Sequence, residues 1–276
     1  MRKLIDFLFE SEFYLKVTLS CAFLQQLFYW LLRDQSLDFL PQVIIYWLLG
    51  SISFYAIGWL IETKIKSNQK LATQLNARVR QVKTQPFPRS AIKAAIIGQV
   101  KSFLAALIIL YIAPEVYRGN AILLNIGWFL FRIILADLCF YLAHRLLHQK
   151  RWQKIHLKHH EYRDTSSFVA GHKSLTEYII VTITDLLPIF ILGYDITQLL
   201  AWTIIGNAYN LEGHSSLSIF FISSDFHDLH HTDYHKNYGI QGFWDRVFNT
   251  LNTPHKKPSL ASPIALIEKR LFESAE

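Results

Sequence analysis

The residues of this chain best suited to chemistry are its twelve histidines, eleven of which lie between positions 144 and 235. They form three tight groups, "HRLLH", "HLKHH" and "HDLHH". Positions i, i+3 and i+4 share one face of a helix, so each group is expected to present its imidazoles together. The grouped histidines are His144 and His148, then His156, His159 and His160, then His227, His230 and His231.

Such clustering predicts metal binding, because neutral imidazole is a common metal ligand and clustered protonated rings would repel one another. A ninth ring, His214, lies nearby. One tetrahedral zinc ion would need only three or four of these ligands, whereas two ions with four or five ligands each would use nearly all of them. Imidazole suits zinc, iron, copper and nickel alike, so the ligands do not name the element. The zinc protease pattern "HEXXH" is absent.

The elements that position these histidines are predicted to be membrane helices. Of the 276 residues, 51% are hydrophobic and 14% aromatic, and the mean hydropathy is +0.20, which is too apolar for an ordinary soluble domain. A helix needs about 20 apolar residues to cross a bilayer. We predict four spans, at about 13–32, 39–61, 94–113 and 121–143.

A further apolar stretch, 175–212, has two short halves that are interrupted by Asp185, Pro188 and Asp195. It is predicted to form a helical hairpin, which either enters the membrane partway or consists of two ordinary spans. The expected fold is therefore all-α: a multi-pass membrane bundle of about four transmembrane helices plus a hairpin, with a histidine-rich cap on the cytoplasmic face.

The net charge of +7 is concentrated in places that indicate orientation. Between Glu62 and Lys93 there are many basic residues and no further acid, so the positive-inside rule places the segment 62–93 in the cytoplasm. The fourth span then returns to the cytoplasmic face near residue 143, where a second basic run begins. Because these runs lie at span ends, orientation and anionic lipid headgroups explain them, and a nucleic-acid partner is not expected.

Two negative expectations accompany this reading. Cys21 and Cys139 both fall within predicted spans, which favours core packing over a disulfide or a thiolate metal site. The first apolar run follows an acidic patch and lacks a small-residue cleavage site, so no cleavable secretion signal is expected.

The order of the motifs resembles the fatty acid hydroxylase superfamily, which includes sterol desaturases, sterol methyl oxidases and sphingolipid hydroxylases. "HRLLH", "HLKHH" and, after a long gap, "FHDLHHTDYHKNYG" with "WDRVFNT" carry the resemblance, from about Asp137 to Thr250. It implies a centre of two iron ions that uses O2 and two electrons to hydroxylate or desaturate a sterol, fatty acyl or sphingolipid substrate. The ligands so implied are His144, His148, His156, His159, His160, His214, His227, His230 and His231.

The sequence departs from the family pattern near His214, where Asn210 occupies the position of a second histidine. Its amide oxygen could ligate, or it could hold a bound water. His172 in "AGHKSLTEY" resembles the family's "HP.E" element, with Lys173 replacing proline and Glu177 displaced. A supporting or gating role is expected for His172 rather than ligation.

Three further residues are expected to carry no chemistry. Asn249 replaces a usual glycine in "WDRVFNT", which predicts a local change of turn. His235 and His255 are expected to be ordinary surface residues.

Asp137 lies seven residues, or two helical turns, before His144 and so on the same face of the fourth span. A carboxylate within a membrane span is costly and usually paired. Asp137 is expected either to accept the free ring N–H of a ligating histidine, fixing its tautomer, or to form an ion pair with Arg132 in the same span.

The resemblance divides the chain into N-terminal transmembrane helices with a basic connector (1–120), a hydroxylase-like domain (121–255) and a C-terminal tail (256–276). No haem-binding or nucleotide-binding motif is visible, so a separate electron donor is expected, similar to a cytochrome b5, a ferredoxin or a reductase. The other expected partners are the lipid substrate and the bilayer. The expected location is the endoplasmic reticulum in a eukaryote or the inner membrane in a bacterium.

Two alternatives remain open from the sequence. A histidine-rich protein that binds or transports metal should carry ionisable residues along several spans, which are nearly free of them apart from Arg132 and Asp137. A catalytically degenerate family member is the other alternative, and Asn210 is the argument for it.

Overall fold

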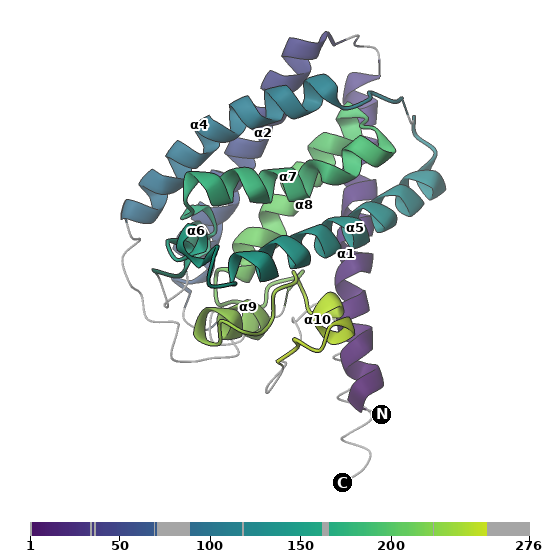
Figure 1. Ribbon diagram of the computed structural model, residues 1–276. Helices are drawn as coiled ribbons and strands as arrows, with labels where there is room; N and C mark the ends of the chain where they lie inside the picture. The colour runs from purple at the N-terminus through teal and green to yellow at the C-terminus, as the bar shows by residue number, and fades with distance from the viewer. Residues whose placement is uncertain are drawn as a thin grey trace.

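The computed structural model describes residues 2–33, 35, 37–68, 70, 89–117, 119–161, 166–222 and 224–252. Within these residues the fold is helical, which confirms the all-α class, and one isolated β-bridge joins Glu115 to Tyr194 (Figure 1). The α-helices are α1 (Arg2–Leu32), α2 (Phe39–Leu60), α4 (Arg89–Ile112), α5 (Ile122–Leu147), α6 (Gln153–His156), α7 (Leu175–Leu192), α8 (Ile196–Gly213), α9 (Ser224–Thr232) and α10 (Phe243–Val247). A π-helical turn, η1 (Ile61–Ile65), and two 3-10 turns, η3 (His159–Glu161) and η4 (Ser167–Gly171), complete the described elements.

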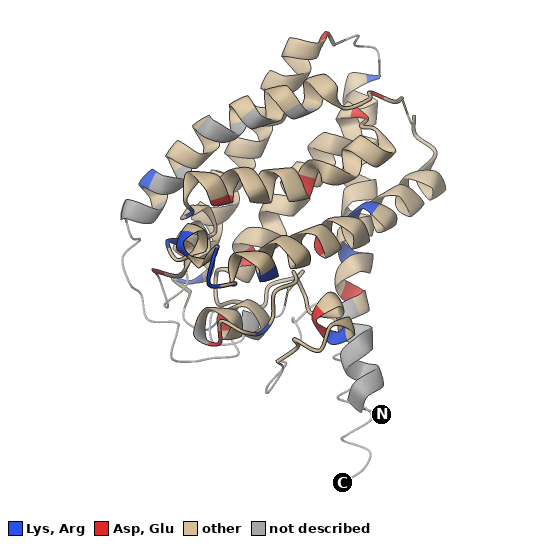
Figure 2. Cartoon of the chain, in the orientation of Figure 1, with Lys and Arg blue, Asp and Glu red and all other residues tan. Residues whose placement is uncertain are grey.

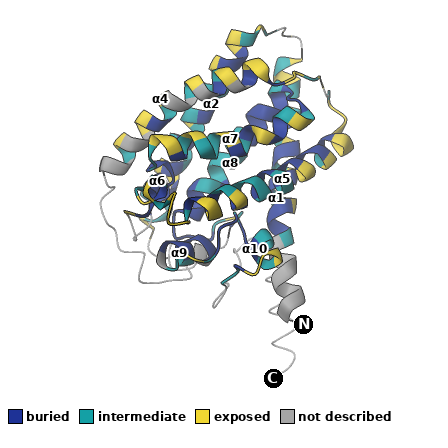
Figure 3. Ribbon diagram, viewed as in Figure 1, coloured by how far each residue is buried: buried dark blue, intermediate teal, exposed yellow. Residues whose placement is uncertain are grey.

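Four of the described helical segments are long and apolar enough to cross a membrane: Ser11–Leu32, Phe39–Ile65, Ile122–Leu147 and Leu175–Leu192. Three of them coincide with predicted spans, and the fourth is the first half of the predicted hairpin. The predicted span 94–113 falls on α4, whose side chains are described only in part and which is not among the four. Large apolar side chains face outward on these helices, including Phe23 at 78% exposure and Leu124 at 75% (Figure 3). This surface is suited to lipid, and the chain is a multi-pass membrane protein.

The helices pack around a core that α1, α5 and α8 share. Val17 and Cys21 of α1 pack with Phe129 and Ile133 of α5 and with Trp202 of α8, all with an exposed fraction of at most 1%. The α2 helix packs against α8 and α4, and α5 packs against α7. Cys21 is therefore a core residue, as predicted, and both cysteines are free thiols.

The predicted hairpin is present as α7 and α8. Gly193 ends α7 with a φ of +73°, where a Cβ would lie 2.8 Å from Val116, so a glycine is required at this close approach. Asp195 then caps α8 by accepting the backbone N–H of Thr197. Since α7 starts just after His172 and α8 ends just before His214, the hairpin leaves the histidine-rich region and returns to it.

The histidine-rich region is a cap on one side of the bundle, formed by α6, η3, η4, α9 and α10 around the C-terminal end of α5 (Figure 1). Basic residues gather near α6 and the end of α5 (Figure 2). The exposed ones include Arg145, Lys150, Arg151 and Lys154.

Several predictions fall on residues that are not described. Most of the basic connector lies there, at 71–88, as do His255 and the tail 256–276. The proposed domain limits and the cytoplasmic orientation of the connector therefore stay predictions.

Candidate metal centre

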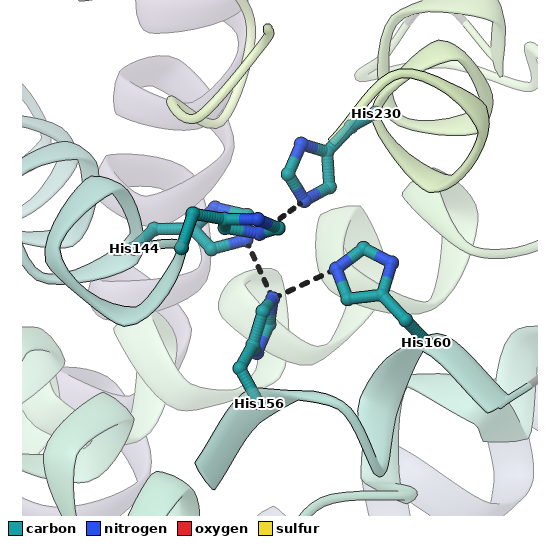
Figure 4. A group of neighbouring side chains, drawn as sticks. His144, His156, His160 and His230 are labelled. Carbon is teal, nitrogen blue, oxygen red and sulfur yellow. Dashed lines mark hydrogen bonds between the residues drawn. The ribbon is translucent and has the colours of Figure 1, made fainter. Parts of the chain in front are cut away.

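The structure brings together all nine histidines that the resemblance implies as ligands, in two groups. Within each group the candidate ligand atoms lie within 4.8 Å of one another. The five-histidine group is His144, His148, His156, His160 and His230, and the four-histidine group is His159, His214, His227 and His231. Four members of the first group are labelled in Figure 4, with ring nitrogens turned toward a common point. Five and four ligands match the counting argument for two ions.

Two cap segments, 156–160 and α9, each divide their histidines between the two groups. On α9, His227 and His231 are four residues apart and join the four-histidine group, while His230 joins the other. In the preceding segment the prediction of a single helix for "HLKHH" is wrong. His156 ends α6 and His159 begins the 3-10 turn η3, because the chain there turns between the two groups. This break directs His159 to one group and His160 to the other.

The spacing between inward-facing nitrogens fits a metal ion. Two ligands about 2.1 Å from one ion and at right angles to each other are about 3 Å apart. In the five-histidine group the Nε2 distances are 3.0 Å for His144–His156, 2.9 Å for His156–His160 and 3.1 Å for His148–His230. In the four-histidine group they are 3.2 Å for His159–His214, 2.9 Å for His214–His227 and 3.1 Å for His227–His231.

The outward nitrogens show which tautomer several rings adopt. Nδ1 of His144 donates to the Tyr238 carbonyl at 2.7 Å, and Nδ1 of His230 donates to the Lys236 carbonyl at 2.8 Å. A carbonyl oxygen can only accept, so in a neutral ring the inward Nε2 atom carries a lone pair. His214 is arranged in the same way, through the backbone carbonyl of Asn210 at 2.7 Å.

The fourth outward contact joins Nδ1 of His156 to Oε1 of Glu177, at 2.8 Å. When the Glu177 carboxylate is ionised it accepts there, and the inward Nε2 of His156 then also carries a lone pair. The Nε2 atoms of His156 and His144 are 3.0 Å apart. Two lone pairs at this distance repel each other unless a cation lies between them. The donor set therefore fits a bound metal ion.

Burial keeps these rings neutral. It lowers the pKa of His148 and of His214 to about 3, with a further contribution from neighbouring charge, which is His230 for His148 and Lys173 for His214. Burial also lowers the pKa of His230 to about 4. Loss of hydration disfavours the charged imidazolium, and the neutral ring is the form that binds metal.

The loop 236–240 supplies two of the outward acceptors, and buried carboxylates hold it in place. Asp245, on α10 within the "WDRVFNT" motif, accepts the backbone N–H of Tyr238 and of Gly239, each at 2.7 Å. It also accepts the hydroxyl of Thr250 at 2.7 Å. Asp245 thereby fixes the Tyr238 carbonyl that orients His144.

The expected roles of Asp137 are wrong for the described contacts. Its carboxylate accepts the Tyr14 hydroxyl and, at 2.8 Å, the backbone N–H of Ile240. Among the described residues, no hydrogen bond or ion pair joins Asp137 to a grouped histidine or to Arg132. The reason is tertiary: α1 and the loop after α9 both reach this face of α5, and their donors take both oxygens. Asp137 thus supports the same loop as Asp245.

The other predicted positions lie around the two groups. Nε2 of His172 contacts Oε2 of Glu161 at 2.8 Å, and His172 belongs to neither group. Asn210 contributes its backbone carbonyl to His214, and its side chain lines a cavity. His235 is exposed, as predicted, and Asn249 has a φ of +58°, a backbone conformation that asparagine tolerates well.

Reasoning from the sequence missed Glu177 and Glu212 as supporting carboxylates, as it missed Asp245. Glu177 was recognised only as a displaced member of the "HP.E" element, although a glutamate at the start of a helix near a histidine group is a visible signal. The Glu212 carboxylate accepts backbone N–H groups from four successive residues at 2.7 to 3.2 Å and so holds the loop that leads to α9. These four residues are Ile219, Phe220, Phe221 and Ile222.

A cavity of about 250 Å³ lies between the histidines and the membrane helices. Its lining includes His144, His156 and His214, together with Phe140 of α5 and Val181 of α7. Further lining residues come from α2, α4 and α8. The candidate metal centre thus adjoins an internal space that extends into the bundle.

The family model described as "Fatty acid hydroxylase" matches residues 129–250, the segment that contains both histidine groups. Human fatty acid hydroxylase domain-containing protein 2 is 26% identical over 133 residues, which are 45% of this chain and 39% of that protein. Methylsterol monooxygenase 1 of Gallus gallus is 30% identical over 128 residues, 42% of this chain and 43% of that protein. Fatty acid hydroxylase ahd1 of Mycosarcoma maydis is 33% identical over 129 residues, 44% of this chain and 32% of that protein.

The matched segment covers less than half of each of these relatives. The segment that the family model matches begins within α5 and ends after α10, so it includes every grouped histidine and excludes α1, α2 and α4. No solved structure gives a significant match to the chain.

Proposed function

We propose that this chain is a member of the fatty acid hydroxylase superfamily, whose family model matches residues 129–250, and that it is an integral membrane oxidoreductase that hydroxylates or desaturates a lipid. The relatives named as fatty acid hydroxylases and methylsterol monooxygenases support a lipid-oxidising activity. The observation that carries the proposal is the pair of histidine groups, whose inward nitrogens are spaced to fit two metal ions and which adjoin a cavity within the membrane bundle.

Two iron ions are the proposed cofactors. One would be held by the five-histidine group and the other by the four-histidine group. Bound there, the irons would supply the activation of O2, with two electrons, that oxidation of an unactivated C–H bond requires. An all-imidazole set is compatible with iron, and the family gives the reason to prefer iron over zinc, copper or nickel.

The protein's own contribution is the orientation of the ligands. The carbonyls of Asn210, Lys236 and Tyr238 and the carboxylate of Glu177 each hold an outward ring nitrogen at 2.7 to 2.8 Å. These contacts fix the tautomer and the rotation of each ring before a metal binds. The cost of ordering the site is therefore met during folding.

The cavity positions the substrate and excludes water. Its walls between the histidines and the membrane helices include Phe140, Leu147 and Val181, which suit an acyl or sterol skeleton. Apolar walls also keep water from the reacting carbon. Whether hydroxylation or desaturation results would depend on which hydrogens of the bound lipid lie nearest the centre.

Electrons are proposed to come from a separate donor at the cap. The exposed basic residues Arg145, Lys150, Arg151 and Lys154 surround the C-terminal end of α5 and α6 (Figure 2). Such a surface favours an acidic partner and increases its rate of association. The positive-inside rule places this surface in the cytoplasm.

The experiment that tests the proposed activity compares lipids extracted from cells that express the wild-type chain with lipids from cells that express His231→Ala. We expect a lipid with one added hydroxyl or one added double bond in wild-type cells only, provided that both proteins reach the membrane in equal amounts. An identical lipid profile in the two strains, with iron-loaded wild-type protein in the membrane, would contradict the proposal.

A further inference from the structure

A pair of charged residues lies inside the membrane bundle, beside the cavity and away from the histidines. Asp185 of α7 lines the cavity, and Arg132 of α5 is completely buried. Ionisable residues within a span are costly and usually serve a function. The two side chains interact electrostatically. No ion pair of 4.0 Å or less joins them among the described residues.

Trp202 of α8 lies between these two residues. The Arg132 guanidinium is 4.4 Å from the centroid of the Trp202 ring and 5.1 Å from that of Trp128. Nε1 of Trp202 donates to Oδ1 of Asp185 at 3.0 Å. Trp202 also lines the cavity. The indole thus fixes the carboxylate at the cavity wall, with Arg132 as a counter-charge behind it.

Neutralisation of Arg132 does not by itself explain where Asp185 lies. A simple counter-ion would be expected to contact the guanidinium, yet Nε, Nη1 and Nη2 of Arg132 are buried without a hydrogen-bond partner. An ionised carboxylate accepts several hydrogen bonds, and Trp202 is the donor found for Asp185 among the described residues. The nearby Thr184 hydroxyl donates to the Val181 carbonyl instead. Asp185 therefore has acceptor capacity left on the cavity side.

The distance between this carboxylate and the metal centre follows from helix geometry. Glu177, Val181 and Asp185 are spaced four residues apart along α7, so they share one face, and all three line the cavity. Glu177 contacts His156 at the metal centre. Eight residues at a rise of 1.5 Å place Asp185 about 12 Å farther along α7. The cavity lining as a whole is mostly apolar.

We propose that Asp185 anchors the hydroxyl group of a neutral lipid alcohol, whose chain lies along α7 toward the histidines. A hydroxyl provides the hydrogen-bond donor that the carboxylate lacks, a carboxylic acid substrate would be repelled, and a hydrocarbon would leave the acceptor unsatisfied. The position of oxidation rests on the proposed function: it lies about 12 Å from the hydroxyl, remote from the polar end.

Competition binding tests the anchor without requiring turnover. Full-length protein in lipid nanodiscs is labelled with a photoreactive long-chain primary alcohol, in competition with the unlabelled alcohol, its methyl ether and the carboxylic acid of equal length. A hydrogen bond to a charged acceptor predicts that the alcohol competes about ten- to a hundredfold better than the ether. Asp185→Asn should reduce this preference to a fewfold.

Thr184→Val is the matched control, because it alters the neighbouring cavity residue while removing a hydroxyl that bonds only within α7. It should keep the preference for the alcohol. Asp185→Asn leaves Arg132 as an uncompensated buried charge, so the double variant Arg132→Gln, Asp185→Asn is measured beside it, with thermal unfolding to show that each protein folds. Full alcohol preference in either folded variant, or stronger competition by the acid, would overturn the proposal.

Product analysis separates this inference from the proposed function. If the protein oxidises lipids, the new functional group should lie on a carbon remote from the hydroxyl, and oxidation at the carbon next to the hydroxyl would overturn the inference while leaving the oxygenase intact. If no lipid is oxidised but the Asp185-dependent preference is found, the anchor is supported and the proposed function fails.

Discussion

Outward hydrogen bonds set the chemistry of individual histidines in this protein. An inward nitrogen can bind a metal only when its proton is on the other nitrogen, and the structure provides an acceptor there for His144, His156, His214 and His230. Three of these acceptors are backbone carbonyls, which substitution cannot remove. Glu177 is the one that can be changed without altering a ligand.

We predict that Glu177→Gln lowers the affinity for iron by about ten- to a hundredfold, because the amide orients His156 less well and removes a negative charge behind it. Chelator competition on purified protein measures the change. Glu161→Gln is the matched control, since Glu161 makes an equivalent contact to His172, which belongs to neither histidine group. Equal losses in both variants would show that the effect does not pass through His156.

Substitutions on α9 distinguish grouped histidines from the exposed one. His230→Ala and His231→Ala should each abolish lipid oxidation, since each removes a ligand from a different group. His235→Ala, at an exposed position four residues farther on, should keep most of the activity. Activity is compared at equal membrane expression. Full turnover by His231→Ala with full iron content would mean that the clustering is accidental.

The sequence was enough to predict which histidines group together. It was not enough to predict all of the residues that hold those histidines in place. Spacing and resemblance identified all nine grouped rings, because histidines this dense are rare and each motif is local. Asp137 was misassigned because its helical register is local information, whereas its partners Tyr14 and Ile240 lie 123 and 103 positions away. Its seven-residue spacing from His144 could not reveal that donors from α1 and the loop after α9 would reach it first.

Among the elements, the cap segments hold the buried histidines and make the protein sensitive to acid. His148 at the end of α5, His214 at the end of α8 and His230 on α9 have pKa values lowered to about 3, 3 and 4. In an unfolded chain a histidine has a pKa of about 6.5. Between pH 6.5 and about 3 the unfolded state therefore binds more protons than the folded state, and stability is lost as the pH falls.

We predict that the melting temperature of the metal-free protein decreases from pH 6.5 toward pH 4, because protonation of the several buried histidines outweighs the opposite contribution of Glu212, whose pKa burial raises to about 7. Thermal unfolding in one detergent, with buffers matched in ionic strength, measures the profile. The prediction would be wrong if the melting temperature were unchanged over that interval, which would mean that the rings are already protonated or solvated in the folded protein.

The sequence also allowed most elements to be predicted, with errors where the chain turns. Long apolar runs gave α2 and α5 within a few residues and the end of α1, which begins at Arg2, well before the predicted start at residue 13. The short halves around Pro188 and Asp195 gave the hairpin. The histidines of the motif "HLKHH" were expected to share one helical face, but the motif divides between α6 and η3. Helical spacing shows which residues could share a face and does not show that neighbours must serve two different metal positions.

For the whole molecule, the path of the hairpin determines which elements can reach the metal centre. It starts and ends at the cap, so the histidines before and after it share one side of the bundle. We predict that reporters fused after residue 92 and after residue 276 both indicate the cytoplasmic side. Opposite sides for the two fusions would require an odd number of crossings between them.

The two histidine groups, with five and four candidate ligands, predict the metal content of the whole protein. Elemental analysis of protein purified from membranes without chelators should find about two iron ions per chain, and the same preparation of His230→Ala should lose iron. About one zinc ion per chain and no iron would contradict a centre of two irons.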